Sequence, residues 1–504
     1  MSAPALVAAI DQGTTGTTVL LLDPQENVVA RAYRELAQSY PAPGWVEHDP
    51  EALWRSVTLT LREALAALPH PAAVAAVGLT NQRETVVLWD RHTGAPVAPA
   101  IVWQDRRTSD ACGRLRDAGY EGRLQALTGL LIDPYFSATK VAWLLDETPG
   151  LRARAEAGEL AFGTIDSYLV WKLSGGRSHV TDMSNAARTQ LFDIHRLAWS
   201  EELCQLFGVP LTLLPRSGPS AGWLAHLEGV EGLDDGIAIT GMAGDQQAAL
   251  FGQGCVNPGD AKCTFGTGSF LLMNVGDSPV VSQQRLLTTV AWSAAGHTQY
   301  AMEGGAFVCG ALVQWLRDGL GLIDRAAEVE ALAASVPDSA GVTIVPAFTG
   351  LGAPHWKPEA RGTIGGLTRG THRGHLARAA LEAMALQNVD IVRAMEADAG
   401  RKLTVLRVDG GASSNDLLMQ IQADLLGVPI ERPAMLESTA LGAGRLAAVG
   451  AGLRPWPGVP EDKITGGLTR FSPRLSERDR LSVYERWQDA VSRTTTERAP
   501  RATP

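Results

Sequence analysis

Cysteine is scarce in this 504-residue chain, and no two cysteines stand close together in the sequence. The five are Cys112, Cys204, Cys255, Cys263 and Cys309. An odd number without a close pair argues against a disulfide framework and against a zinc site. A run of about 18 apolar residues and a cleavable N-terminal leader are absent as well. We therefore expect a cytoplasmic protein in a reducing compartment, with no membrane span.

A stripe of basic residues is also missing. The 44 Lys and Arg residues are scattered and are outnumbered by 54 Asp and Glu, which gives a net charge of -10. Without a basic face to displace counterions, nucleic acid is excluded as a partner. Hydrophobic residues at 45% and charged residues at 19% are typical of globular proteins. Because single cores stop growing near roughly 250–300 residues, the length predicts two domains of similar size.

One strand-turn-strand unit occurs twice. Apolar residues 6–10 and 19–22 flank a Gly/Thr turn, and residues 261–265 and 270–273 flank a second turn of the same kind. The separation is about half of the chain, which favours duplication of one domain type. We place the boundary near Phe251-Gly252, giving domains 1–251 and 252–504 with a flexible tail from about 492 to 504. Helical and strand patterns alternate within each half, so the fold class is α/β.

The first turn has the composition of a phosphate-holding loop. Gly13, Thr14, Thr15 and Gly16 offer free backbone N–H groups, close approach and hydroxyl donors. A plain hairpin is the alternative, but Asp11 ends an apolar strand, where a carboxylate is costly without a cation. Magnesium carried by a nucleotide would supply that cation. No G-x-x-x-x-G-K-[ST] motif exists, so this is not a P-loop protein.

Two later segments can serve the same nucleotide. Thr267 lies in the second turn and would face the same phosphates from the other domain. Gly410 and Gly411 permit close approach of a flat adenosine, and Asn415 follows at the start of a helix. Each segment alone could be an ordinary turn.

A candidate acceptor site comes from residues that follow strands. Asp245 stands just beyond a strand near the boundary and could take the proton of an alcohol that attacks a phosphoryl group, although a helix cap is the simpler reading. Arg83 and Glu84 follow another strand, at the end where open α/β sheets bind ligands. As alternatives, the Arg-Glu pair could be a solvated surface pair. Trp103 and Tyr135 could be core aromatics.

In this order, the segments resemble the FGGY carbohydrate kinases, and the acceptor-side segments resemble those of members that phosphorylate glycerol. The resemblance extends from Ile10 beyond Gly444. It rests on DQGTT (11–15), PGWVEHDP (43–50), TNQRET (80–85), AIVWQ (100–104), DPYFSATK (133–140), TDMSNAARTQLF (181–192), AGDQQAALFGQ (243–253), VPAFTGLGAP (345–354) and RVDGGASSN (407–415).

The resemblance implies two ribonuclease-H-like domains of the actin and hexokinase type, with ATP and Mg²⁺ in the cleft between them. It implies transfer of the γ-phosphoryl group to glycerol, giving sn-glycerol 3-phosphate and ADP in glycerol catabolism, by a dimer or tetramer. The first domain would bind glycerol and phosphate, and the second would bind the nucleotide. Implied glycerol contacts are Arg83, Glu84, Trp103, Tyr135, Asp245, Gln246 and Phe270. Implied nucleotide contacts are Thr14, Thr15, Gly16, Thr267, Gly310, Gln314, Gly411 and Asn415. Asp11 is the candidate metal ligand and Asp245 the candidate base.

Two departures from the family pattern limit these expectations. Thr18 stands where relatives often carry Arg, so one charged phosphate contact could be absent. Residues 229–235 lack the Gly/Arg-rich loop that binds fructose 1,6-bisphosphate in some relatives, and their acidic character would repel a bisphosphate. Two other functions remain open, a kinase for another polyol or ketosugar and an actin-like protein that binds nucleotide without catalysis.

Overall fold

A glycine-turned hairpin opens the sheet of each half of the chain. The computed structural model describes residues 5–68, 73–357, 359–435, 437–456 and 467–496. In the first half β1 (Leu6–Gln12) and β2 (Gly16–Leu22) are antiparallel, as are β15 (Ala261–Phe265) and β16 (Ser269–Gly276) in the second. A backbone bond between two glycines closes each turn, Gly13 N to Gly16 O at 2.9 Å in the first and Gly266 N to Gly268 O at 2.8 Å in the second. The two predicted hairpins are therefore present.

The hairpins belong to one continuous sheet. Its order is β23-β22-β21-β15-β16-β18-β17-β13-β14-β5-β1-β2-β3. The remaining strands are β3 (Val28–Glu35), β5 (Val74–Asn81), β13 (Ala221–His226), β14 (Ala238–Gly244), β17 (Leu287–Ala294), β18 (His297–Ala306), β21 (Leu406–Asp409), β22 (Ile430–Arg432) and β23 (Thr469–Phe471). The same arrangement occurs twice in this sheet. Three antiparallel strands are followed by two parallel ones in β3-β2-β1-β5-β14 and again in β18-β16-β15-β21-β22. This repeated order is what duplication of one domain type produces.

Each half also contains helices. In the first half they are α1 (Pro50–Ala66), α2 (Ser109–Asp117), α3 (Glu121–Thr128), α4 (Ser137–Glu147), α5 (Leu151–Glu156), α6 (Ile165–Leu173), α7 (Met183–Ala186), α8 (Glu201–Phe207) and α9 (Asp245–Gly252). In the second half they are α10 (Gly310–Asp318), α11 (Glu328–Ala334), α12 (Arg373–Ala399), α13 (Asp416–Leu426), α14 (Ser438–Gly450) and α15 (Glu477–Thr496). Short strand pairs are β4 (Glu47–His48) with β7 (Ala100–Ile101), β6 (Val87–Asp90) with β8 (Leu160–Gly163), β9 (Val180–Asp182) with β12 (Arg216–Gly218), β10 (Phe192–Asp193) with β11 (Ala198–Trp199), and β19 (Thr343–Val345) with β20 (Thr363–Gly365).

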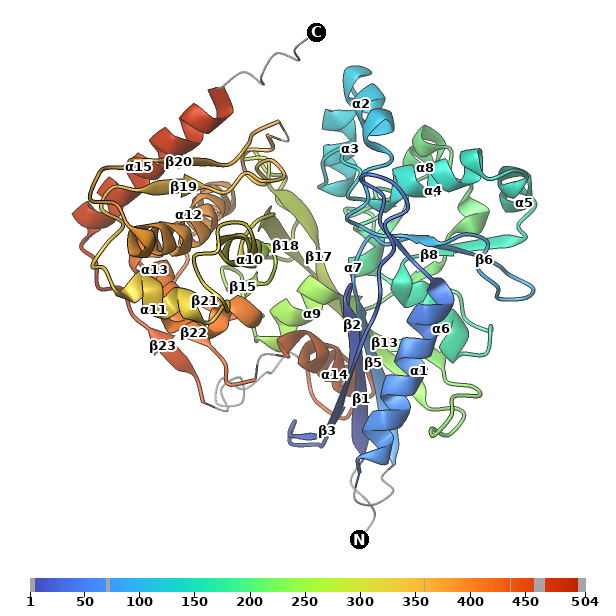
Figure 1. Cartoon of the computed structure of the whole chain (residues 1–504). Helices are drawn as coiled ribbons and strands as arrows, with labels where there is room; N and C mark the ends of the chain where they lie inside the picture. The colour runs from blue at the N-terminus through green and yellow to red at the C-terminus, as the bar shows by residue number, and fades with distance from the viewer. Residues whose placement is uncertain (1–4, 69–72, 358, 436, 457–466, 497–504) are drawn as a thin grey trace.

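Two helices, α9 and α14, lie between the halves (Figure 1). Helix α14 belongs to the second half in sequence, yet it packs on β1, β5 and β14 of the first half and on α9. Its small residues allow this, since a Cβ at Gly442 would lie 1.8 Å from the carbonyl oxygen of Ala248. The expected boundary near Phe251-Gly252 thus falls at the end of α9, and a later helix crosses back over it.

The last residues that the structure describes belong to a helix, α15. Of the tail expected to be flexible, residues 492–496 form the last turn of α15, and Thr494 is 4% exposed. Residues 497–504 lie outside the described part. All five cysteines are buried with free thiols. No helix among the described residues has the length and apolarity needed to cross a membrane.

Candidate active site

Two neighbouring parallel strands bring Arg83 and Asp245 together. Strand β5 ends at Asn81 and β14 ends at Gly244, and these two residues pair in register. Asp245 then begins α9, while Arg83 lies two residues beyond β5. The Arg83 side chain passes directly over Gly244, where a Cβ would lie 2.7 Å from its Cδ. As a result, Arg83 Nε lies 3.2 Å from Asp245 Oδ1.

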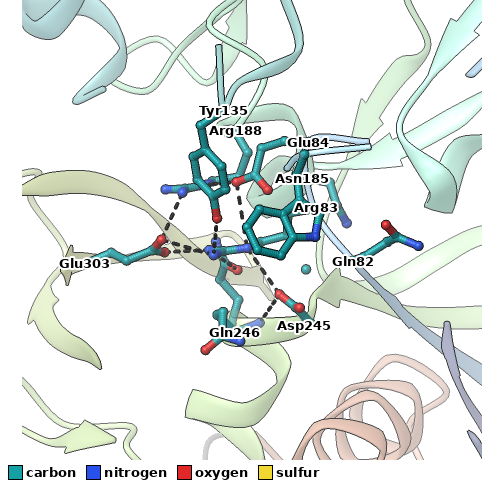
Figure 2. A network of polar contacts seen from close by, with 12 residues as sticks. Gln82, Arg83, Glu84, Tyr135, Asn185, Arg188, Asp245, Gln246 and Glu303 are labelled. Carbon is teal, nitrogen blue, oxygen red and sulfur yellow. Dashed lines mark hydrogen bonds and ion pairs between the residues drawn. The ribbon is translucent and has the colours of Figure 1, made fainter. Parts of the chain in front are cut away.

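Arg83 is part of a fully buried cluster of four charges (Figure 2). Glu303 on β18 accepts from Arg83 Nη1 at 2.5 Å and from Nη2 at 3.0 Å. Arg188 Nη2 donates to the same carboxylate at 2.9 Å, and Arg188 Nε donates to Glu84 at 2.7 Å. The two positive and two negative charges balance, which lowers the desolvation free energy of burying the cluster.

The two glutamates of the cluster respond differently to burial. Burial raises the pKa of Glu84 despite Arg83 and Arg188. Burial also opposes ionisation of Glu303, but the two guanidinium groups outweigh it and lower its pKa to about 2. Glu303 is therefore ionised at every pH at which the protein would work.

Aromatic rings wall the site. The Trp103 ring lies 5.5 Å from Tyr135 and 6.3 Å from Phe270, both edge-on. Trp103 also donates from Nε1 to Thr14 Oγ1 at 2.9 Å, which links the wall to the first hairpin turn. Tyr135 is held by Lys140, whose buried Nζ donates to three consecutive carbonyls of residues 134–136. Rings from both halves therefore enclose one apolar surface beside Arg83 and Asp245.

Asp245 has the properties of a proton acceptor. Its side chain is 29% exposed, whereas Glu303 is 2% exposed, so a small molecule can reach the Asp245 carboxylate. Burial raises the pKa of Asp245 although Arg83 and Lys262 oppose the shift. Its Oδ1 accepts from the backbone N of Gln246 at 2.6 Å, which fixes the carboxylate at the start of α9.

Asp11 is a carboxylate that a bound cation would stabilise. Burial, and then the charge of Asp245, raises the pKa of Asp11 to about 8. Among the described residues, no set of three or more His, Cys, Asp or Glu side chains could hold a metal ion unaided. Two nearby carboxylates without a full ligand set fit Mg²⁺ that arrives with a nucleotide, because such ions take one or two carboxylates and otherwise phosphate and water oxygens.

The two hairpin turns approach this site from opposite halves. Thr15 and Thr267 stand exposed at their tips. Asp11, at the end of β1, is electrostatically coupled to Asp245, and so is Lys262 of β15. Helix α10 begins against the second turn, where Gly310 N donates to Gly266 O at 3.0 Å. Both hairpins therefore converge on Asp245.

The remaining nucleotide candidates lie along the second half. Gln314 is exposed on α10, one turn after Gly310. Gly411 has open space where a Cβ would point, and Asn415 caps α13 by accepting from Leu418 N at 2.8 Å. Open space at Gly411 is what close approach of a ligand requires.

The structure thus gathers the predicted acceptor residues, but sequence reasoning missed three charged members of the site. Glu303 and Lys262 lie in buried strands and Arg188 follows a short helix. Lys262 Nζ donates to Gln246 and, at 2.7 Å, to Thr264. A charge within an apolar strand was the signal that singled out Asp11, and the same signal would have found Glu303 and Lys262.

Both halves of the chain match models of one known protein family. Two models of the FGGY family of carbohydrate kinases match, the N-terminal domain over residues 6–252 and the C-terminal domain over residues 261–451. A glycerol kinase of Aromatoleum aromaticum is 58% identical over 487 residues, covering 96% of this chain and 98% of that protein. A glycerol kinase of Dechloromonas aromatica is 55% identical over 490 residues, covering 97% of each.

Solved structures agree with the sequence relatives. A glycerol kinase of Plasmodium falciparum, crystallised with ADP, superposes with a TM-score of 0.93 at 34% identity and covers 99% of this chain and 100% of that chain. A xylulose kinase of Lactobacillus acidophilus superposes with a TM-score of 0.87 at 20% identity, covering 98% of this chain and 99% of that chain, and shows the fold alone.

Proposed function

The chain belongs to the FGGY family of carbohydrate kinases, and we propose that the site around Arg83 and Asp245 holds glycerol with one terminal hydroxyl turned to the γ-phosphoryl group of ATP. The activity itself follows from relatives more than half identical over nearly the whole chain: it is the phosphorylation of glycerol by a kinase. The 3.2 Å contact between Arg83 and Asp245, inside one aromatic wall, carries the assignment of the site.

Glycerol recognition needs donors and acceptors that cannot move. Arg83 and Glu84 are fixed by the buried cluster, and Tyr135 lies with its hydroxyl 3.4 Å from Arg83 Nη2. Gln246 stands beside Asp245 at the start of α9. Hydroxyl groups would bind these polar atoms, while Trp103 and Phe270 would cover the carbon skeleton and exclude water and longer chains.

Asp245 is the proposed base. It is exposed enough to meet a hydroxyl, and it binds a proton more readily than an ordinary aspartate. Taking the hydroxyl proton lets the oxygen attack the phosphorus, while alignment supplies most of the rate. Arg83, 3.2 Å away, orients the carboxylate without forming a bidentate pair with it.

ATP would lie across both hairpin turns. The first turn would contribute Thr14, Thr15 and Gly16, and the second half would contribute Thr267, Gly310, Gln314, Gly411 and Asn415. Asp11 would hold Mg²⁺, which would neutralise charge on the phosphates. A cytoplasmic location and assembly into a dimer or tetramer complete the proposal and rest on the family resemblance.

An acceptor panel tests this function. Purified protein is assayed for ADP release with glycerol, dihydroxyacetone, xylulose and ribulose side by side. We expect glycerol to give the highest kcat/KM. Preference for a pentulose would indicate another sugar kinase of the family, and ADP release that no acceptor stimulates would indicate an actin-like protein that only binds nucleotide.

A further inference from the structure

Glu303 belongs to the second half of the chain but is bound by arginines of the first. It lies on β18, which pairs directly with β16, the strand that carries Phe270. Residues 303 and 305 of β18 share a face of the sheet, and Gly305 pairs with Phe270. A Cβ at Gly305 would lie 3.1 Å from the Phe270 ring. Neighbouring strands of the second half therefore deliver one anion and one ring to the acceptor site.

The hydrogen bonds of Arg83 show what this anion does. A guanidinium has five N–H donors in a rigid plane. Nε faces Asp245 at 3.2 Å, Nη1 donates to Glu303 and, at 3.3 Å, to Gln247, and Nη2 donates to Glu303. Among the described residues, the remaining Nη2 donor meets the Tyr135 hydroxyl at 3.4 Å, a long contact. One donor of Arg83 is therefore left for a ligand beside Tyr135.

The two-point contact to Glu303 fixes that donor in space. A bidentate arginine–carboxylate pair sets the plane of the guanidinium as well as its position. Without Glu303, the nearest anions to Arg83 are Asp245 and Glu84, at 3.2 and 3.8 Å. The guanidinium would then turn toward Asp245, and its free donor would leave the Tyr135 side.

We propose that Glu303 is a positioning residue for glycerol, which holds Arg83 so that one N–H faces the acceptor and Asp245 stays free of a bidentate ion pair. The acceptor site is therefore completed by a side chain of the second half. This inference rests on the proposed function, because it assumes that Arg83 binds the acceptor.

Steady-state kinetics of Glu303→Gln test the proposal, because glutamine keeps the shape and removes the charge. We expect the KM for glycerol to rise at least about tenfold, or 1.4 kcal/mol, with the KM for ATP within about twofold. Glu431→Gln is the matched control, since Glu431 is also a buried strand glutamate bound to an arginine, at 2.9 Å from Arg470, but lies on β22, which β21, β15 and β16 separate from β18. The control should change neither KM.

A double variant shows whether Glu303 acts through Arg83. Adding Glu303→Gln to Arg83→Met should raise the glycerol KM no further than Arg83→Met alone. Full additivity would overturn the proposal, as would a Glu303→Gln enzyme of lowered melting temperature that keeps the wild-type glycerol KM.

Two further measurements keep the test decisive. If Glu303→Gln does not fold, Glu303→Asp replaces it, where a raised glycerol KM supports the proposal and an unchanged one overturns it. The wild type is measured first: absence of glycerol-stimulated ADP release would refute the proposed function itself, whereas an active wild type with an unaffected Glu303→Gln variant would refute only the role of Glu303.

Discussion

Replacing Asp245 by asparagine separates the chemistry of this residue from its structural contacts. Asparagine keeps Oδ1, which can still accept from Gln246 N at 2.6 Å and face Arg83 Nε at 3.2 Å, but it cannot take a proton. General bases contribute about 10²- to 10⁴-fold, so we expect kcat to fall by that factor, or about 3–5 kcal/mol in activation free energy. The KM for glycerol should change by less than about threefold, because the binding contacts remain.

The same substitution should not destabilise the fold. Because the pKa of Asp245 is raised, the folded chain binds this proton more tightly than the unfolded chain does. The ionised carboxylate therefore costs stability once the pH exceeds the ordinary aspartate pKa of about 3.9. Asparagine avoids that cost, so its melting temperature should equal or exceed that of the wild type near neutral pH, and the gain should vanish toward pH values below about 3.9.

The assay is coupled ADP release with saturating ATP, together with thermal unfolding of both proteins without ligands. Asp110→Asn is the control, because Asp110 is exposed in the first turn of α2 and the same change there should leave kcat intact. An Asp245→Asn enzyme that keeps more than about a tenth of the wild-type kcat would refute the reasoning, since another group would then be taking the proton.

Three further predictions test the wall of the site, the packing of glycines and a buried histidine. Lys140→Met removes bonds to three backbone carbonyls and should cost at least about 3 kcal/mol of unfolding free energy while raising the glycerol KM, measured by urea unfolding and kinetics. Gly442→Ala should lower the melting temperature, because its Cβ would meet the carbonyl of Ala248 at 1.8 Å, whereas Gly411→Ala should leave it unchanged and raise the KM for ATP. Burial lowers the pKa of His179 to about 4, so the wild type should lose up to about 3 kcal/mol more than His179→Gln as the pH falls from about 6.5 to 4, and equal losses in urea unfolding would contradict this.

Local features of this fold could be predicted from sequence. Helix α13 begins directly after Asn415, where the sequence predicts a helix start, and both glycine-threonine turns join strands as expected. Glycine turns and helix caps act over a few residues, so their information is contained in a short stretch of sequence.

Long-range partners could not be predicted in the same way. The sequence identifies Arg83 and Asp245 as candidates, but it does not reveal that Glu303, 220 positions after Arg83, binds the same guanidinium. Helix α14 likewise reads as a small-residue helix of the second half, although it packs on the first. Such contacts depend on how the two halves of the sheet join, which happens where β13 pairs with β17 through Ala221 and Ala294.

The pKa values of two carboxylates beside Arg83 support the proposed role of Asp245 as the base. Glu303 and Asp245 face the same cation, yet the pKa of Glu303 is lowered to about 2 and that of Asp245 is raised. Glu303 pairs with two arginines and its side chain is 2% exposed, so it remains an anion that is shielded from any ligand. Because the positive charge of Arg83 is already balanced there, Asp245 keeps its affinity for a proton. Environments that separate the pKa values of neighbouring acids suit them to different roles, which supports the proposal that Glu303 is the fixed counterion and that Asp245 exchanges a proton with the acceptor.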